Sequence, residues 1–260
     1  MLHHRQTRNI PLADRWSFLW LALSAVLGLF SFGYWVIPVA AWLTTVFAIR
    51  FLRTQPVWRG FTLMVLVSVA VNIYAGRDLV PMPFPMSIGL IALQVLLGSL
   101  PFLADRLLAP RLQGLAATLI FPLAATAWEF LNLTNSPLGS FGSAAYVNYG
   151  NLPLMQLASL TGIWGITFLM HWFATVVNWS WEHAFEPKLI WRGVMVYAAI
   201  FLLVLVYGNA RLLFAPQPTT QTVRMAGITI APKPLSELLP LYWQDFAAFR
   251  TETRAIHEQY

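Results

Sequence analysis

The sequence predicts an all-α membrane protein: about seven transmembrane helices, followed by the first strand and helix of an α/β domain. Three observations predict this fold class. The chain of 260 residues is 58% hydrophobic and only 10% charged, whereas soluble domains carry about 25% charged residues. Its mean hydropathy is +0.63. Its apolar residues form stretches close to the roughly 20 residues that cross a bilayer as a helix, and its basic residues lie mainly between those stretches.

Seven apolar stretches define the expected membrane bundle, residues 1–214. The first two are short and are joined by Ser31-Phe32-Gly33, so we expect a helical hairpin that barely spans the bilayer. The third is short as well and could extend back toward Trp58. The stretches are Trp16–Phe30, Tyr34–Phe51, Phe61–Ala75, Met86–Leu103, Leu112–Leu131, Leu157–Trp179 and Ile190–Leu213.

The basic residues predict the orientation of this bundle. The amino terminus and the second, fourth and sixth gaps together hold ten Lys and Arg, whereas the other three gaps hold only Arg77. Because basic residues near spans stay on the cytoplasmic side, we expect a cytoplasmic amino terminus and an outer tail after Leu213. Since these residues flank spans, the net charge of +6 indicates topology and predicts no nucleic-acid partner.

Residues 215–260 form the second expected unit, a linker and the start of another domain. Ala215-Pro216-Gln217-Pro218 cannot continue a helix. Thr222–Ile230 has strand character, and Leu241–Tyr260 has the pattern of an amphipathic helix. A stable domain needs about three strands with a covered apolar face, so we expect this domain to be unfinished within the chain.

The most informative segment is a long neutral loop between the fifth and sixth apolar stretches. From Asn132 to Gln156, 25 residues contain no Lys, Arg, Asp or Glu. Loops of this length usually have a function or are disordered. We expect the loop to lie at a membrane surface, on the same side as the tail.

Glu129 is the only acidic residue well inside a predicted span, about one turn before the neutral loop. A carboxylate within a membrane segment is a candidate functional group. It could also serve the structure by accepting hydrogen bonds from the amides and hydroxyls of the loop, since such networks also hold acids in place. Both interpretations stay open on the sequence alone.

Ser136, Tyr146 and Gln156 join Glu129 as candidate lipid-binding residues. The small, turn-forming residues around Ser136 let the backbone approach a lipid closely. The aromatic and amide groups of Tyr146, Asn148 and Gln156 suit the headgroup region of a bilayer. Anchoring of the loop at the interface is the alternative role for these residues.

Ser159, Gly162 and Gly165 recur every three residues in the sixth stretch, which predicts small residues near one side of a helix and close helix packing. No metal site is expected, because the chain has no cysteine and His171 lacks a second ligand at metal-binding spacing. No cofactor is expected, since no phosphate-binding glycine motif is present, and no nucleophile elbow marks a catalytic serine.

Three segments around the neutral loop carry a family resemblance. They are Pro122 to Glu129 with Phe130-Leu131, the turn-rich loop itself, and Leu154-x-Gln156-Leu157-Ala158 followed by Gly162-Ile163-Trp164-Gly165-Ile166-Thr167-Phe168. Together they resemble the apolipoprotein N-acyltransferases. The chain departs from that family at Asn132, where many members have Arg, and at Asn135–Gly139, where they have a Gly-Phe-Pro-Trp-like turn.

The resemblance implies eight membrane helices and a periplasmic nitrilase-like domain, a carbon-nitrogen hydrolase fold, inserted before the last helix. It also implies transfer of an acyl chain from a phospholipid to a cysteine thiol, and then to the amino-terminal cysteine amine of a lipoprotein. The family's catalytic Glu, Lys and Cys cannot be carried over. The sequence has no Cys, and the tail residues Glu237, Glu252 and Glu258 match the catalytic Glu poorly. We therefore expect no catalytic residue in this chain.

The expected function is the lipid-binding membrane portion of an apolipoprotein N-acyltransferase-like enzyme, with phospholipid and lipoprotein as its partners. The resemblance implies a multi-pass location in the bacterial inner membrane, with the amino terminus cytoplasmic and the tail periplasmic. The alternative is a non-catalytic membrane scaffold, or a lipid-binding subunit of a separately encoded hydrolase. A small-solute transporter is less favoured, since such sites usually show more polar groups at mid-membrane.

Overall fold

The computed structural model describes residues 14–33, 35–76, 84–136 and 139–214, and these residues form helices and connecting turns without any strand. The expected strand Thr222–Ile230 and helix Leu241–Tyr260 lie outside the described residues. The helices are α1 (Ser17–Gly28), α2 (Pro38–Thr54), α3 (Val57–Ala75), α4 (Phe84–Gly98), α5 (Leu100–Leu108), η1 (Ala109–Arg111), η2 (Gly114–Thr118), α6 (Ile120–Thr134), η3 (Ala144–Asn148), α7 (Leu152–Met155), α8 (Ala158–Thr161), α9 (Ile163–Glu182) and α10 (Pro187–Leu213).

Four helical segments within the described residues are long and apolar enough to cross a bilayer: Val57–Ala75, Pro85–Arg111, Gly114–Thr134 and Pro187–Leu213. A bent pair, Leu152–Thr161 and Ile163–Glu182, gives a fifth if it forms one broken span. The all-helical prediction is confirmed for these residues, but the count of about seven spans is not. The reason is length, since α1 has 12 residues and α2 has 17, against the roughly 20 of a full span.

Proline and glycine determine where the long helices break. The segment Pro85–Arg111 divides into α4 and α5 around Ser99, because Pro101 has no N–H to donate to the carbonyl group one turn earlier. The predicted single stretch Leu157–Trp179 is two helices, because the chain turns by 118° at Gly162. Gly162 has a φ of +65°, which glycine adopts at little steric cost.

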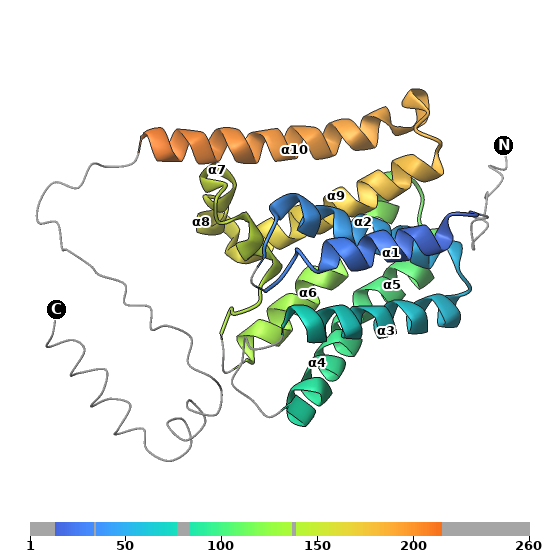
Figure 1. The fold of residues 1–260 in the computed structure, drawn as a ribbon. Helices are drawn as coiled ribbons and strands as arrows, with labels where there is room; N and C mark the ends of the chain where they lie inside the picture. The colour runs from blue at the N-terminus through green and yellow to red at the C-terminus, as the bar shows by residue number, and fades with distance from the viewer. Residues whose placement is uncertain (1–13, 34, 77–83, 137–138, 215–260) are drawn as a thin grey trace, which may run out of the picture.

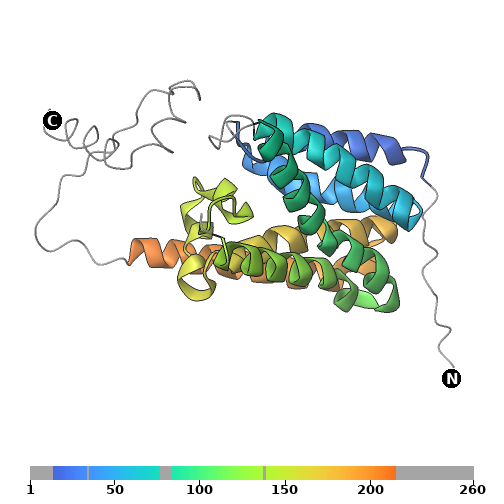
Figure 2. The ribbon, with the colours of Figure 1, turned by 90° about the horizontal axis from the view of Figure 1, so that it is seen from below.

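Most of the long helices run roughly along one direction, with α4 tilted across them, and α9 lies at the centre of the bundle (Figure 1). It contacts α2, α6 and α10, while α1 and α2 form the expected hairpin and pack along their length. The helix α10 flanks α9 on the side opposite α3 and α4, and Figure 2 shows the same arrangement from below. This order places the connections α2–α3, α5–α6 and α9–α10 at one end and the neutral loop at the other.

Three buried clusters form the core of the bundle. The first joins α9 to η3, α7 and α10 and includes Ala145, Leu154 and Tyr197. The second joins α1, α2 and α3, and the third joins α2, α6 and α9 around Phe121. The neutral loop therefore contributes side chains to the core, although the sequence predicts only a surface location for it.

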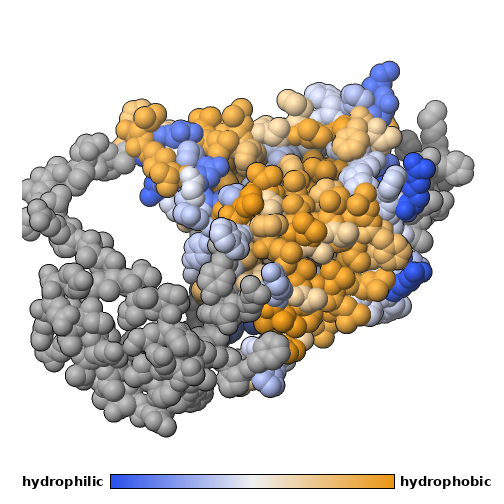
Figure 3. Space-filling view, in the orientation of Figure 1, coloured by the Kyte–Doolittle hydropathy of each residue, from blue (hydrophilic) through white to orange (hydrophobic). Residues whose placement is uncertain are grey.

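The outer surface of the bundle is largely apolar between two more polar ends (Figure 3). Large apolar side chains are exposed along α3, α4 and α10, among them Leu66, Leu93 and Leu203. Soluble monomers rarely expose contiguous apolar surface of this extent. Contact with lipid acyl chains explains it, in agreement with the predicted membrane location.

Candidate functional site

The neutral loop and the carboxyl end of α10 lie at the same end of the bundle (Figure 1). A Cβ atom at Gly208 of α10 would collide with the carbonyl oxygen of Pro153 in α7. The hydroxyl groups of Ser159 in α8 and Tyr207 in α10 lie 2.9 Å apart. The part of α10 around Tyr207 and Gly208 is therefore packed against α7 and α8.

The loop itself is folded into short helices that polar side chains cap. Ser143 accepts a hydrogen bond from the backbone N–H of Ala145 at the start of η3, at 3.2 Å. Asn151 accepts one from the N–H of Leu154 at the start of α7, also at 3.2 Å. Asn is a favoured N-cap residue and Pro is favoured in the first turn of a helix. Asn151 followed by Pro153 therefore marks the start of α7 in the sequence.

Glu129 lies on α6, partly buried, and anchors the loop. Its Oε1 atom accepts a hydrogen bond of 2.9 Å from the backbone N–H of Ala144, at the first residue of η3. This is the structural contact that one interpretation of Glu129 predicts. This hydrogen bond holds η3 at the end of α6. A role of Glu129 in lipid binding stays a prediction.

Asn148 is the loop residue whose place differs most from the expectation. The sequence suggests an amide group in the headgroup region, but Asn148 is only 3% exposed. Its Oδ1 atom accepts a hydrogen bond from the Trp42 indole of α2 at 2.9 Å, and its Nδ2 atom lies 3.0 Å from the Met170 sulfur of α9. These partners lie 106 and 22 residues away in the chain, so no local pattern could identify them.

Tyr146 and three apolar neighbours form the exposed edge of the loop. We call Phe141, Tyr146, Tyr149 and Leu152 the loop rim, since all four side chains are exposed and none is charged. The Tyr146 hydroxyl pairs with that of Ser140. Aromatic side chains of this kind are enriched where a protein meets the headgroups of a bilayer.

Ser136 and Gln156, the other candidate lipid-binding residues, lie at the two ends of the loop. The carbonyl oxygen of Ser136 accepts a hydrogen bond from the N–H of Gly139 at 3.0 Å. The Gln156 side-chain amide donates to the Leu152 carbonyl at 3.4 Å. The side chains of Glu129, Tyr146 and Gln156 thus each bond a different loop residue, and these bonds rigidify the loop.

Ser159, Gly162 and Gly165 do not share one helix, in contrast to the prediction. Ser159 belongs to α8, Gly162 is the break, and Gly165 belongs to α9. A Cβ atom at Gly165 would lie 2.9 Å from Cβ of Thr161. The absence of that atom lets α8 fold back against α9, so the small residues serve the bend.

A buried ion network occupies the opposite end of the bundle. The Arg53 guanidinium of α2 donates to both oxygens of Asp105 in α5, at 2.8 and 2.9 Å, and to Glu182 of α9, at 3.1 Å. Arg106 donates to the carbonyl oxygens of Leu52 and Gln55. The sequence predicts only a topological role for these arginines. It does not show that α5 and α9 continue past the apolar stretches, which brings Asp105 and Glu182 to Arg53.

A second ion pair lies at the same end, between Arg50 and Asp14 at 3.1 Å. The Arg50 guanidinium also stacks over the Trp181 ring, 4.6 Å from its centroid. Burial acts to raise the pKa of Asp14, but hydrogen bonds from the Trp20 indole, the Trp16 amide and Arg50 outweigh it and lower that pKa. The carboxylate is therefore held charged beside Arg50.

The part of the chain that the structure describes contains no cluster of three or more His, Asp or Glu residues suited to a metal ion. His171, the isolated histidine of the sequence analysis, packs edge-to-face against the Phe121 ring at 5.2 Å.

Comparison with protein families identifies the bundle. The model of the apolipoprotein N-acyltransferase N-terminal domain matches residues 17–176, from the start of α1 to within α9. Comparisons with curated proteins and with solved structures gave no match. The matched region covers more than half of the chain and includes Glu129, the neutral loop and the break at Gly162. The chain therefore belongs to the family of the apolipoprotein N-acyltransferase N-terminal domain.

Proposed function

We propose that this chain is the membrane portion of an apolipoprotein N-acyltransferase-like enzyme, and that its neutral loop binds the phospholipid acyl donor. One observation carries the proposal: a folded, uncharged loop with an aromatic rim is packed against the carboxyl end of α10 (Figure 1). The donor is a phospholipid and the acceptor a lipoprotein, both at the periplasmic face of the inner membrane.

The physical case for lipid binding rests on the chemistry of the loop rim. Phe141, Tyr146, Tyr149 and Leu152 offer apolar and aromatic surface to the ester region of a lipid, and no charge of the loop competes for its headgroup. The hydrogen bonds of Glu129 and Asn148 fix the loop before a lipid arrives. A fixed loop loses less conformational freedom on binding.

Residues 215–260 have a matching role in this proposal. They would start the periplasmic nitrilase-like domain, and they follow in sequence on α10, which packs against α7 and α8 at Tyr207 and Gly208. A catalytic domain on this connection would lie above the lipid held at the loop rim. The resemblance implies that the reaction needs this arrangement, because the donor's ester bond must reach a thiolate.

The thiolate itself is not supplied by this chain. The family's reaction forms a thioester on a cysteine activated by a neighbouring base, and the sequence contains no cysteine. We expect the purified chain to transfer no labelled acyl group from phospholipid to a diacylglyceryl lipopeptide above the rate without protein. Transfer above that rate would contradict this part of the proposal.

Lipid binding at the loop rim can be tested by cross-linking. The full chain would be reconstituted in nanodiscs containing a phospholipid with a photoreactive group beside its ester bonds, and the cross-linked peptides mapped by mass spectrometry. We expect the segment Gly139–Gln156 to be enriched, and Tyr149→Ser to lower that yield several-fold. Trp58→Ser is the matched control, since Trp58 is 70% and Tyr149 74% exposed at opposite ends of the bundle. Equal loss in both variants, or no enrichment of the segment, would contradict lipid binding there.

A further inference from the structure

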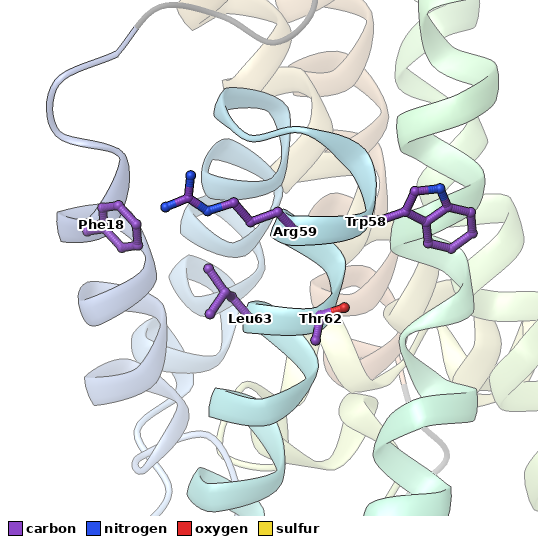
Figure 4. Close-up of a pocket in the computed structure, with 5 residues that line it drawn as sticks. All are labelled: Phe18, Trp58, Arg59, Thr62 and Leu63. Carbon is purple, nitrogen blue, oxygen red and sulfur yellow. The ribbon is translucent and has the colours of Figure 1, made fainter.

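An open pocket of about 550 Å³ lies at the end of the bundle away from the neutral loop, against the first turns of α1 and α3. It is lined by Phe18 of α1 and by Trp58, Arg59, Thr62 and Leu63 of α3. Figure 4 shows Arg59 and Leu63 pointing from α3 toward Phe18, with Thr62 and Trp58 turned away from α1. The pocket shares no residue with the loop rim.

Arg59 supplies the positive charge of the pocket. Its guanidinium lies over the Phe18 ring, 5.9 Å from the centroid. The acids Asp14, Asp105 and Glu182 at this end pair with Arg50 and Arg53 instead, and Arg59 forms no salt bridge within the described part of the chain. An exposed guanidinium held against an aromatic ring remains available to an anion, and its planar donors suit phosphate.

Two further features add positive potential at the starts of α3 and α1. The helix α3 begins at Val57 with no side-chain cap, so the N–H groups of its first turn point outward without helical partners. Such a helix start favours phosphate. Arg15 is also exposed at the turn into α1, with its guanidinium 5.1 Å from the Trp16 ring centroid.

The walls of the pocket are apolar, which distinguishes a lipid from a free anion. Phe18 and Trp58 are exposed, and Leu63 continues the apolar surface along α3 toward the middle of the bundle. A charged group at the helix start with apolar side chains below it matches a lipid's phosphate and the upper part of its acyl chains.

We propose that this pocket binds the headgroup of an anionic phospholipid, with Arg59 contacting the phosphate and Phe18 and Leu63 contacting an acyl chain. The site lies at the end opposite the neutral loop, so this lipid belongs to the other leaflet from the proposed acyl donor. The inference is independent of the proposed function and holds or fails on its own.

The test is native mass spectrometry of the full chain in detergent, with phosphatidylglycerol, phosphatidylcholine or diacylglycerol added. We expect the wild-type chain to retain phosphatidylglycerol best and diacylglycerol least. Arg59→Gln should lower retention of phosphatidylglycerol at least five-fold. Arg111→Gln is the matched control, since Arg111 is another exposed arginine at this end of the bundle, and it should change retention less than two-fold.

Two further measurements distinguish a bound lipid from a bound free anion. Leu63→Trp fills the apolar part of the pocket without changing its charge, so it should also lower retention several-fold. Inorganic phosphate at millimolar concentration should not displace the lipid. Equal retention of diacylglycerol and phosphatidylglycerol, equal effects of Arg59→Gln and Arg111→Gln, or displacement by inorganic phosphate would each overturn the proposal.

Discussion

Replacing Arg53 by methionine is expected to lower the free energy of unfolding by about 3–5 kcal/mol, the usual cost of removing one partner of a buried ion pair. Arg53 is only 2% exposed and is the shared partner of Asp105 and Glu182. Its loss would strand the buried Asp105 carboxylate between α2 and α5, and would remove one ion-pair partner of Glu182 in α9. Desolvation of unpaired charge is the cause of the large effect.

The measurement is reversible unfolding of the full chain in mixed micelles, with Arg111→Met as the control. The control makes the same substitution at an exposed arginine, where changes stay within about 0.5 kcal/mol. Adding Asp105→Leu to Arg53→Met should restore part of the stability, because it removes the stranded charge. If Arg53→Met costs no more than Arg111→Met, the buried ion network does not hold this end of the bundle together.

Substituting Gly208 by alanine is expected to separate α10 from the neutral loop and to destabilise the protein by about 1–3 kcal/mol, as overpacking does. The added Cβ atom would collide with the Pro153 carbonyl oxygen, a backbone atom that no side-chain rotation can move away. A loss of stability would indicate this collision, because alanine in a helix is otherwise favoured over glycine by about 1 kcal/mol.

Gly89→Ala in α4 is the matched control, since no atom lies within 4 Å of a Cβ atom built there. We expect Gly89→Ala to leave stability unchanged or slightly raised. Limited proteolysis should cut the segment Gly139–Gln156 faster in Gly208→Ala only. If the two variants unfold alike and are cut alike, α10 does not pack against the loop as described.

The sequence predicts well those features that depend on composition and local pattern. Apolar stretches of bilayer length predict α6 and α10, and the extension of the short third stretch back toward Trp58 is seen in α3, which begins at Val57. The hydrogen-bonding interpretation of Glu129 is seen in its contact with Ala144. Each of these follows from residues close together in the chain.

Features that depend on distant contacts could not be predicted in this way. Hydropathy treats Leu157–Trp179 as continuous, although the positive φ of Gly162 breaks it. Arg53 and Asp105 lie 52 residues apart, so a count of basic residues between spans cannot show that they are paired and buried. The sequence predicts an interfacial amide at Asn148. The packing of α2 instead places the Trp42 indole against that amide, and the two groups form a hydrogen bond.

The central claim is that the neutral loop and the tail after α10 lie on the same, periplasmic side of the membrane. The chain has no cysteine, so a single introduced thiol is the one thiol of this protein that a membrane-impermeant maleimide can label in spheroplasts. We predict that Tyr149→Cys and Thr220→Cys are both labelled in intact spheroplasts, and that Lys188→Cys is labelled only after permeabilisation. Labelling of Tyr149→Cys and Thr220→Cys from opposite sides would contradict the claim, and the proposed acyl-donor site with it.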